Sequence, residues 1–525
     1  MIIRSPLVEV TLPSEPLTTV VLRRSSELPD HALVIDGLSG RTISCGELAS
    51  LVRRFAVGLR DLGLVHRDVV AICLPNCLEF AVAFLGAAES GCIVTRLNPL
   101  MSANEIATRL SDCAAKVVFT NGEPGGKVAE AAARLIGQPL KIVCIDSMPG
   151  FTTCDTLLDN AGEHRSAAIH PYDLVMLPYS SRTTGLPNGV MLTHHHLVPN
   201  IAQVTPVEQI DGTTIELRVL PMIHISGMLT VLCNALAQGA TLVPLPRLEF
   251  ETFLTAVERY HVTRTYLVPP ILLKLVKDPA VDRADLSSLK TLVSGAAPLG
   301  PETVRAVSAR IGCFVKQIYG LTETSPVTHL NPEDPARSKP HSVGQLVPNT
   351  EVRVVDPETS RDVERNELGE IWIRSPQVMQ GYLDRHDATV QRLDAEGWLH
   401  TGVIGPCDED GHFVIVDRTK ELIKYNAYQV APAELETILN AHPTVADCAV
   451  VPSTDPQNGE VPKTFVALKS GEWATARELI DFAAARVAPY KNVRRVAFAD
   501  QIPKSASGKI LRRLLVEQKR VEQRS

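Results

Sequence analysis

Hydroxyl-bearing residues gather between positions 177 and 194, in the stretch Leu-Pro-Tyr-Ser-Ser-Arg-Thr-Thr-Gly-Leu-Pro-Asn-Gly-Val-Met-Leu-Thr-His. Small residues let a backbone approach a ligand, and hydroxyls beside free backbone N–H groups can surround an anion. The stretch therefore predicts a phosphate-holding loop, although an ordinary surface loop has the same composition. It is not of the Walker type, because the order Gly-x-x-x-x-Gly-Lys-Ser/Thr is absent. The residues expected to hold phosphate are Ser180, Ser181, Thr183, Thr184 and Gly185.

This stretch resembles the signature loop of the acyl-adenylate-forming enzymes. That superfamily contains acyl-CoA synthetases, 4-coumarate–CoA ligases, luciferases and the adenylation domains of peptide synthetases. Three further motifs of the superfamily follow in its order, and the resemblance spans nearly the whole chain. They are Gly295-Ala-Ala-Pro-Leu299, Tyr319-Gly-Leu-Thr-Glu323 and Pro503-Lys-Ser-Ala-Ser-Gly-Lys-Ile510.

The resemblance implies roles for single residues. Tyr319 is expected to stack on adenine, Thr322 to meet the α-phosphate, and Glu323 with Thr184 to hold Mg²⁺. Magnesium prefers hard oxygen ligands and neutralises phosphate charge as a carboxylate attacks. Lys509 and Lys424 are the expected catalytic lysines, because a point charge on a long stem can bridge carboxylate and phosphate. The remaining expected nucleotide contacts are Gly295, Ala296, Ala297, Pro298, Gln317, Gly320, Arg418 and Gln429.

The acid is expected to bind near His224, which lies in Leu220-Pro-Met-Ile-His-Ile-Ser-Gly227 and matches the histidine at the mouth of the superfamily's acyl pocket. Ser226 stands where aryl-CoA ligases commonly carry tyrosine, so we expect a widened pocket. The residues that form the pocket wall, or simply belong to the core, are Met222, Ile223, Ile225, Pro326 and Val327. The expected pocket residues are His224, Ile225, Ser226, Pro326 and Val327.

Several positions depart from the superfamily pattern. Val403 replaces an aspartate that, in the superfamily, accepts hydrogen bonds from the ribose hydroxyls, and a valine side chain accepts no hydrogen bond. The loss of such charge-assisted bonds costs about 1.5–3 kcal/mol. Arg182 replaces a glycine and Asn188 a lysine of the phosphate loop, and Arg182 is a candidate to restore the lost charge. Asn426 and Ala427 replace a Lys-Gly pair, and Ala427 is expected to narrow the route of the CoA thiol.

Strand-like and helix-like segments alternate from residue 31 to residue 311, which predicts a mostly parallel sheet covered by helices. The expected strands are 32–36, 69–74, 116–120, 174–177, 190–193, 218–221, 240–245, 264–268 and 289–294. The expected helices are 47–62, 77–88, 226–236, 250–260, 271–277 and 301–311. A β-rich part follows, with strands expected at 351–355, 369–374 and 412–416.

A compact α/β pattern closes the chain after the charged residues 418–421, and it reads as a separate small domain. Its expected helices are 433–441, 475–487 and 510–520, and its expected strands are 445–451, 463–468 and 493–498. We therefore predict an α/β fold: a large multi-subdomain N-terminal AMP-binding and acyl-substrate domain (1–417), and a small mobile lid domain (418–525). The lid is expected to swing about Lys420.

The composition is that of an ordinary globular protein, with 45% hydrophobic and 21% charged residues among 525. The net charge of −7 gives no basic field that would favour nucleic acid or an anionic membrane. No apolar run is long enough to span a bilayer, and the N-terminus lacks a secretory pattern. The eleven scattered cysteines are interpreted as core residues in a reducing cytoplasm. The consecutive histidines 194–196 do not predict a metal site, because they cannot all face one ion.

The sequence thus predicts an ATP-dependent acyl-CoA synthetase that converts a fatty or aryl-propenoic acid through acyl-AMP to a CoA thioester. Its expected cofactors are ATP, Mg²⁺ and coenzyme A, and it is expected to bind the nucleotide more weakly than other members of the superfamily do. Two alternatives stay open. One is a degenerate, non-catalytic relative that binds an acyl ligand or a partner. The other is an adenylating enzyme that passes its acyl group to a carrier protein.

Overall fold

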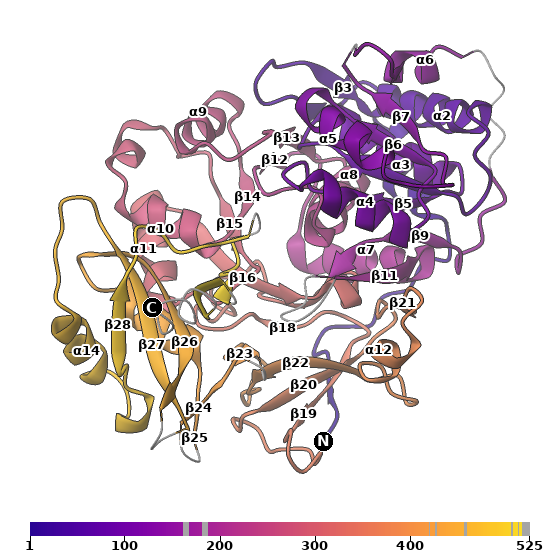
Figure 1. Cartoon of the computed structure of the whole chain (residues 1–525). Helices are drawn as coiled ribbons and strands as arrows, with labels where there is room; N and C mark the ends of the chain where they lie inside the picture. Colours follow the sequence, from indigo (N-terminus) through magenta and orange to yellow (C-terminus); the bar gives the residue numbers. More distant parts are fainter. Residues whose placement is uncertain are drawn as a thin grey trace.

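The computed structural model describes residues 1–146, 148–160, 167–180, 187–418, 421–425, 428–455, 459–505, 508–512 and 514–516. Within these ranges the chain forms four β-sheets, two of nine strands and two of five (Figure 1). The two large sheets are rich in parallel strands, and the C-terminal sheet belongs to a smaller unit. The predicted α/β fold is confirmed.

The first large sheet has the strand order β10-β11-β9-β5-β4-β6-β7-β8, with β21 paired to β11. Its strands are β4 (Val69–Cys73), β5 (Ile93–Arg96), β6 (Val117–Thr120), β7 (Lys141–Cys144), β8 (Thr152–Thr153), β9 (Leu174–Leu177), β10 (Tyr179–Ser180), β11 (Asn188–Thr193) and β21 (Gly381–Tyr382). The helices around it are α2 (Cys45–Asp61), α3 (Leu78–Glu89), α4 (Ala103–Asp112), α5 (Gly122–Ala132), α6 (Cys154–Leu158) and α7 (His194–Glu208). The helix α2 begins at a capping box formed by Ser44 and Glu47, and it buries Leu48, Val52 and Phe55 against the sheet.

The second large sheet has the order β18-β17-β16-β15-β14-β12-β13-β2-β3. Its strands are β2 (Ala32–Ile35), β3 (Thr42–Ser44), β12 (Ile215–Arg218), β13 (Thr241–Pro244), β14 (Arg264–Leu267), β15 (Thr291–Ser294), β16 (Phe314–Gly320), β17 (Val327–Leu330) and β18 (Gln345–Leu346). Its helices are α1 (Leu17–Val21), α8 (Asn234–Gln238), α9 (Phe250–Tyr260), α10 (Pro269–Lys277) and α11 (Pro301–Ile311). Strands β12, β14, β15 and β16 are parallel neighbours, so their carboxyl ends lie at one edge of the sheet.

The predicted β-rich part is an antiparallel sheet of order β1-β19-β20-β22-β23. Its elements are β1 (Ile3–Arg4), β19 (Glu351–Val355), β20 (Gly369–Arg374), β22 (Leu399–Gly405), β23 (Asp417–Arg418) and the helix α12 (His386–Val390). The short 3₁₀ turns of the chain are η1 (Arg23–Ser25), η3 (Pro279–Arg283), η4 (Thr322–Thr324) and η5 (Pro489–Lys491). Residues 412–416, expected as a strand, form only two isolated bridges, both at Phe413, with Gly344 and with Cys407.

The C-terminal unit has the strand order β25-β24-β27-β26, with β28 paired to β27. Its elements are β24 (Ile423–Tyr425), β25 (Tyr428–Val430), β26 (Val445–Asp455), β27 (Gly459–Leu468), β28 (Arg495–Phe498), α13 (Pro432–Asn440) and α14 (Ala476–Ala484). It lies beside α10 and α11 of the second large sheet (Figure 1). The Nζ of Lys277 on α10 donates to the carbonyls of Asn440 and Val445, at 3.4 and 3.2 Å. The boundary at residue 417 and the mobility of this unit stay predictions, and most of the expected helix 510–520 lies outside the described residues.

Two further expectations differ from the structure. The strand expected at 218–221 is β12, which ends at Arg218, so residues 219–221 leave the sheet. The helix expected at 226–236 begins as a π-helix, η2 (Ser226–Cys233), and continues as α8. A π-helix is wider than an α-helix and often occurs at functional sites.

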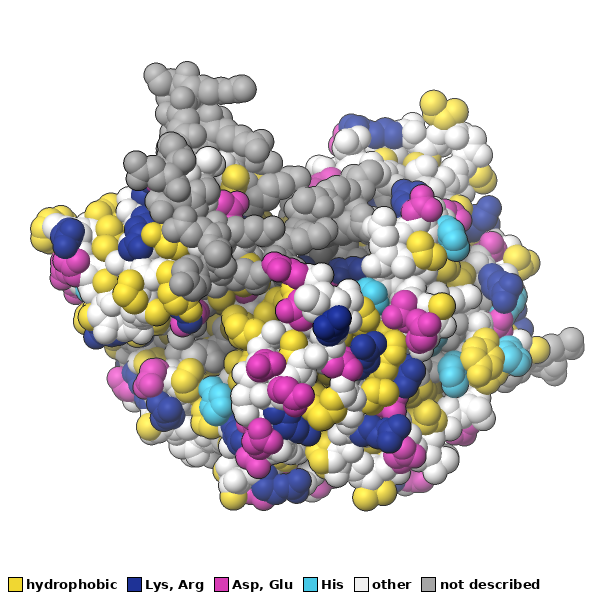
Figure 2. All heavy atoms as spheres, turned by 90° about the horizontal axis from the view of Figure 1, so that it is seen from below, with side chains coloured by type: hydrophobic (Ala, Val, Ile, Leu, Met, Phe, Trp, Pro, Cys, Tyr) yellow, Lys and Arg dark blue, Asp and Glu magenta, His cyan; other side chains and the backbone are white. Residues whose placement is uncertain are grey.

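The surface carries charges of both signs. Figure 2 shows lysine, arginine, aspartate and glutamate side chains intermixed on one face, in keeping with the small net charge of −7. Among the described residues, no helix has the length and apolar character needed to cross a membrane. All eleven cysteines are free, and ten of them are buried.

Candidate active site

Two cavities meet at the carboxyl ends of the parallel strands, where ligands of open α/β sheets bind. The first, of about 210 Å³, lies between the second large sheet and the C-terminal unit. The second, of about 340 Å³, extends between the two large sheets. Both are lined by Ala296 and by the four residues 318–321 at the end of β16. The end of β16 is therefore a shared wall between two binding spaces.

The loop 295–299 follows β15 and forms part of this wall. Ala296 has a φ of +70° and lines both cavities, whereas Ala297 and Pro298 line the first and Gly295 the second. The Gln317 carboxamide holds the loop from behind. It accepts a hydrogen bond from the Leu299 N–H at 3.3 Å and donates to the Leu299 and Pro340 carbonyls at 3.2 and 2.7 Å. Gln317, expected to contact nucleotide, thus positions the loop that lines both spaces.

The segment 319–323 turns from β16 into η4. Tyr319 and Gly320 line both cavities and Thr322 lines the second. The Oε1 of Glu323 accepts a hydrogen bond from the Tyr382 hydroxyl at 2.8 Å, and the Glu323 carbonyl accepts one from the Met379 N–H at 2.8 Å. The first bond orients the Glu323 carboxylate, and the second holds the Glu323 backbone beside the turn.

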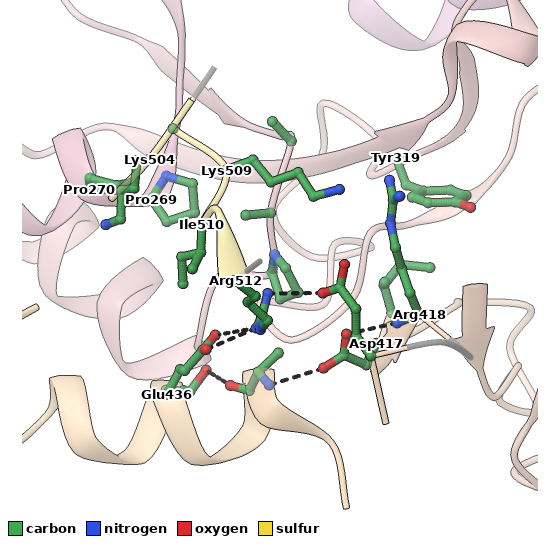
Figure 3. A pocket seen from close by; sticks show the side chains of 18 of the residues that line it. Pro269, Pro270, Tyr319, Asp417, Arg418, Glu436, Lys504, Lys509, Ile510 and Arg512 are labelled. Atoms are coloured by element: carbon green, nitrogen blue, oxygen red, sulfur yellow. Dashed lines mark hydrogen bonds and ion pairs between the residues drawn. The ribbon is translucent and has the colours of Figure 1, made fainter. Parts of the chain in front are cut away.

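Lys509 and Arg418 bring positive charge to the first cavity from the C-terminal side. Figure 3 shows both side chains extending toward the same space, with the Tyr319 ring beside the Arg418 guanidinium. Neither cation has a salt bridge among the described residues, whereas Arg512 nearby binds Glu421 at 2.9 Å and Glu436 at 2.8 Å. The first cavity therefore contains two cations available to an anion.

The pKa of Lys509 is lowered to about 8, chiefly by burial and then by the neighbouring Arg418 charge. Glu421 opposes this shift, Arg512 adds to it, and Asp417 opposes it. Lys509 is still mostly cationic at neutral pH, but it is poised to lose its proton in mild alkali.

Val403 lies on β22 directly opposite Arg418 on β23. It is 3% exposed and lines the first cavity. The departure noted in the sequence is therefore on the wall of the space that Arg418 and Lys509 share. A valine offers that space no hydrogen-bond acceptor.

The second cavity contains the expected acid-pocket residues. His224, Ile225, Ser226, Pro326 and Val327 all line it, as does Ile223, while Met222 is buried outside the lining. Burial lowers the pKa of His224 to about 4, with further lowering by the charges of Arg96 and Arg218. His224 is thus a neutral imidazole at neutral pH.

Part of the predicted phosphate loop can be placed. Ser180 is buried on β10 and pairs with Asn188 on β11, so Asn188 is a buried residue at the base of the loop. The expected residues Ser181, Arg182, Thr183, Thr184 and Gly185 lie outside the described residues, as do Lys420, Asn426 and Ala427. The side chains of Lys424 and Gln429, on β24 and β25, are also outside the description.

Two histidines of the 194–196 run have hydrogen-bond partners in the fold. Thr193 precedes α7, which begins at His194. The His194 ring accepts a hydrogen bond from the Leu17 N–H at 3.0 Å, and the His196 ring accepts one from the Thr193 N–H at 3.0 Å.

Three arginines of the second cavity were not predicted from the sequence: Arg96, Arg109 and Arg218. The available signal was a charged residue inside an apolar strand, as in Ile-Val-Thr-Arg-Leu around Arg96 and Leu-Arg-Val-Leu around Arg218. That signal does not reveal which residues meet, because the two strands belong to different sheets.

The sequence matches two family models. Residues 22–383 match the model described as AMP-binding enzyme, and residues 434–509 match the AMP-binding enzyme C-terminal domain. A 4-coumarate–CoA ligase 1 of Solanum tuberosum is 42% identical over 529 residues, covering 98% of this chain and 96% of the relative. A 4-coumarate–CoA ligase of Pinus taeda is 41% identical, covering 97% of this chain and 96% of the relative.

Solved structures have the same architecture. ATP-bound MatB from Rhodopseudomonas palustris superposes with a TM-score of 0.85 at 26% identity, covering 96% of this chain and 99% of that one. The anthranilate CoA ligase AuaEII in complex with anthranoyl-AMP gives a TM-score of 0.91 at 24% identity, covering 98% and 99%. The second similarity is one of fold alone.

Proposed function

Because the chain belongs to the AMP-binding enzyme family, we propose that it is an acid–thiol ligase that joins a carboxylic acid to AMP and then to coenzyme A. AMP-binding CoA ligases use ATP, Mg²⁺ and coenzyme A. The observation that carries the proposal is the shared wall at the end of β16. A nucleotide in the first cavity and an acid in the second would meet at Gly320, within a site that holds two cations without ion pairs among the described residues.

In the first half-reaction, the acid carboxylate attacks the α-phosphate of ATP, and pyrophosphate leaves as acyl-AMP forms. Lys509 stabilises the negative charge that gathers between the two reactants, since a lysine ammonium reaches both. Arg418 binds the nucleotide beside the Tyr319 ring, and Thr322 donates to the α-phosphate. His224 is neutral, so it contributes a hydrogen bond rather than a charge at the acid pocket.

The residues present fit a magnesium ion that arrives with the nucleotide. Among the described residues no group of three or more His, Cys, Asp or Glu gathers to hold a metal by itself. Mg²⁺ is typically bound by one or two carboxylates together with substrate phosphates and water, and the Glu323 carboxylate, oriented by Tyr382, would supply one such oxygen ligand. The ion would neutralise charge on the phosphates during attack.

In the second half-reaction, the thiol of coenzyme A displaces AMP from the acyl group. We propose that the C-terminal unit turns about Lys420 between the two steps, which removes Lys509 from the shared wall and opens a path for the thiol. The fatty or aryl-propenoic character of the acid, the cytoplasmic location and the weakened nucleotide grip caused by Val403 are part of this proposal. The non-catalytic and carrier-protein alternatives are outcomes of its test.

The test is acid-dependent exchange of labelled pyrophosphate into ATP, followed by thioester formation with coenzyme A. We expect exchange with at least one acid, and its loss in Lys509→Met but not in Lys290→Met, which removes an exposed lysine. Exchange without a CoA thioester would contradict the acceptor and favour a carrier protein. No exchange at millimolar ATP, even in Val403→Asp, would contradict the ligase function and favour a non-catalytic relative.

A further inference from the structure

The acid-side cavity has a cationic lining of its own. Arg96 at the end of β5, Arg109 on α4 and Arg218 at the end of β12 all face it. Among the described lining residues there is no aspartate or glutamate. The charge of Arg109 lowers the pKa of Arg96, and the charges of Arg96 and Arg218 both lower the pKa of His224, in keeping with their places around one cavity. A space with this lining attracts an anion.

Several donors in this cavity are buried without a hydrogen-bond partner among the described residues. They are Nε and Nη1 of Arg96, Nε of Arg218, Nε2 of His224 and Oγ1 of Thr230. A buried polar group is nearly always hydrogen-bonded, and an unpartnered one is costly, most of all when it is charged. Burial lowers the pKa of Arg96 to about 9, which still leaves it cationic at neutral pH. These polar groups are therefore available to a ligand.

The surrounding structure fixes these arginines in place. Arg218 is 2% exposed and lies so close to Gly227 that a Cβ there would be 2.1 Å from its Nη2. Its own Nη2 donates to the Pro221 carbonyl at 3.2 Å. The buried Glu216 lies two residues earlier on β12, and burial raises its pKa to about 8. Arg109 stacks on the Tyr179 ring at 3.5 Å. Side chains that the protein already holds in one conformation lose little conformational entropy when a ligand binds.

The position of Arg218 in the sheet places it far from the reacting end of the cavity. The strand order runs β16, β15, β14 and β12, so three strand spacings separate Arg218 from Gly320. At about 4.8 Å per spacing this amounts to about 14 Å across the sheet. Gly320 lies further along β16 than Lys316, the residue in register with Arg218, which adds to the separation. An acid whose carboxylate meets the nucleotide at Gly320 would therefore present its other end to the arginines.

We propose that this cavity selects acids with a second anionic group at the far end, a dicarboxylic acid in particular, whose distal carboxylate binds Arg96 and Arg218. The inference rests on the proposed function and names its substrate class. Guanidinium groups bind carboxylates through two parallel hydrogen bonds, which suits a planar distal carboxylate. An acid with an apolar tail leaves the buried cations unpaired. The rival occupant is the pyrophosphate part of ATP, and the experiment separates the two.

The experiment compares matched acids in pyrophosphate exchange: adipic with hexanoic acid, and 4-carboxycinnamic with 4-coumaric acid. We expect kcat/KM for the diacid of each pair to exceed that for the monoacid by at least about tenfold, the value of one charge-assisted hydrogen bond. Arg96→Gln should lower kcat/KM for the diacids by about ten- to a hundredfold, with no loss for the monoacids and no change in the KM for ATP. Arg247→Gln, an exposed arginine paired with Glu249, is the control for charge and should change nothing.

The role of Arg218 is tested in the double variant Glu216→Gln/Arg218→Gln, because replacing Arg218 alone would leave Glu216 buried without its neighbouring cation. The melting temperature of the double variant shows whether it folds. If it does not fold, Arg96→Gln decides alone. Monoacids preferred by the wild type, or a rise in the KM for ATP in Arg96→Gln with both acids affected equally, would overturn the inference and leave the ligase function standing. If no acid supports exchange, the proposed function fails. Calorimetry of adipate against hexanoate without nucleotide then tests the inference separately, and equal or absent binding overturns it.

Discussion

At the scale of single residues, the structure distinguishes two lysines that the same motif carries. In Pro503-Lys-Ser-Ala-Ser-Gly-Lys-Ile510, Lys504 forms an ion pair with Asp447 at 2.6 Å, whereas Lys509 has none among the described residues. Both line the first cavity. A cation already paired with a carboxylate has little charge left for a substrate, so Lys509 is the one suited to activate an acid. The motif alone does not make this distinction.

The lowered pKa of Lys509 predicts how activity depends on pH. The protonated form stabilises the transferring phosphate, so kcat/KM for adenylation should fall as pH rises through about 8 in the free enzyme. Lys509→Arg should keep part of the activity and move this alkaline limb to higher pH, because a guanidinium stays protonated. Pyrophosphate exchange at subsaturating ATP, measured between pH 6 and 10 in overlapping buffers, gives the profile. If kcat/KM of Lys509→Arg falls at the same alkaline pH as that of the wild type, the fall is caused by a group other than Lys509.

Val403 gives a second prediction at this scale. Val403→Asp places a carboxylate opposite Arg418, on the wall of the nucleotide cavity. We expect the KM for ATP to fall by about ten- to a hundredfold, since each charge-assisted bond to ribose is worth about 1.5–3 kcal/mol. Val403→Asn should give a smaller gain. A higher melting temperature with unchanged KM would show that the new carboxylate only pairs with Arg418 and does not reach the nucleotide.

At the scale of elements, amphipathic helices with clear ends were predicted best. The helices α9 and α11 have the predicted bounds, because each has apolar residues at helical spacing and an unambiguous start. The strand at Arg218 was shifted, since the apolar run Val-Leu-Pro that follows it belongs to a turn over the acid-side cavity and not to the sheet. The motif 295–299 was correctly placed after a strand, β15, whereas the strand β16, which ends in the motif 319–323, was not predicted. The common cavity of Arg96 and Arg218 was not predictable, because it depends on how two separate sheets pack.

The hydrogen bonds between the Gln317 side chain and the loop 295–299 give a prediction at the scale of elements. Gln317→Met keeps the side-chain length but removes two donors and one acceptor from the loop and from Pro340. We expect about 1–3 kcal/mol less stability, together with raised KM values for both ATP and acid, because Ala296 lines both cavities.

Gln138→Met is the matched control for Gln317→Met. The Gln138 amide also donates to two carbonyls, those of Leu110 and Ala115 at 3.2 and 3.1 Å, and it lines neither cavity. This variant should lose stability without a change in either KM. Urea unfolding and steady-state exchange separate the two effects, and equal KM values in both variants would contradict a positioning role for Gln317.

At the scale of the whole molecule, the candidate site is complete only when the C-terminal unit is docked. Lys277 donates across the junction to Asn440 and Val445, and Gly300 at the start of α11 lies against Thr437 of α13. Gly508 lies against Val268, so the junction also positions its neighbour Lys509. The predicted membership in the acyl-adenylate-forming superfamily is confirmed by the family models. The turning of the C-terminal unit between the two half-reactions stays a proposal. The contacts between this unit and the rest of the protein offer a test of it.

The close approach of Gly300 to Thr437 provides that test. A Cβ at Gly300 would be 2.5 Å from the Thr437 methyl, whereas the next nearest atom, Thr437 Cβ, would be 3.8 Å away. Gly300 has a φ of −67°, which alanine adopts without strain, so Gly300→Ala disturbs the docking and not the backbone. We expect it to slow pyrophosphate exchange, which needs Lys509 at the shared wall, and to spare thioester formation from supplied acyl-AMP. Thr437→Ala in the same chain removes the clashing methyl and should restore exchange, and Thr437→Ala alone is the control. Equal loss of both half-reactions in Gly300→Ala would contradict the proposal that only adenylation uses this docked arrangement.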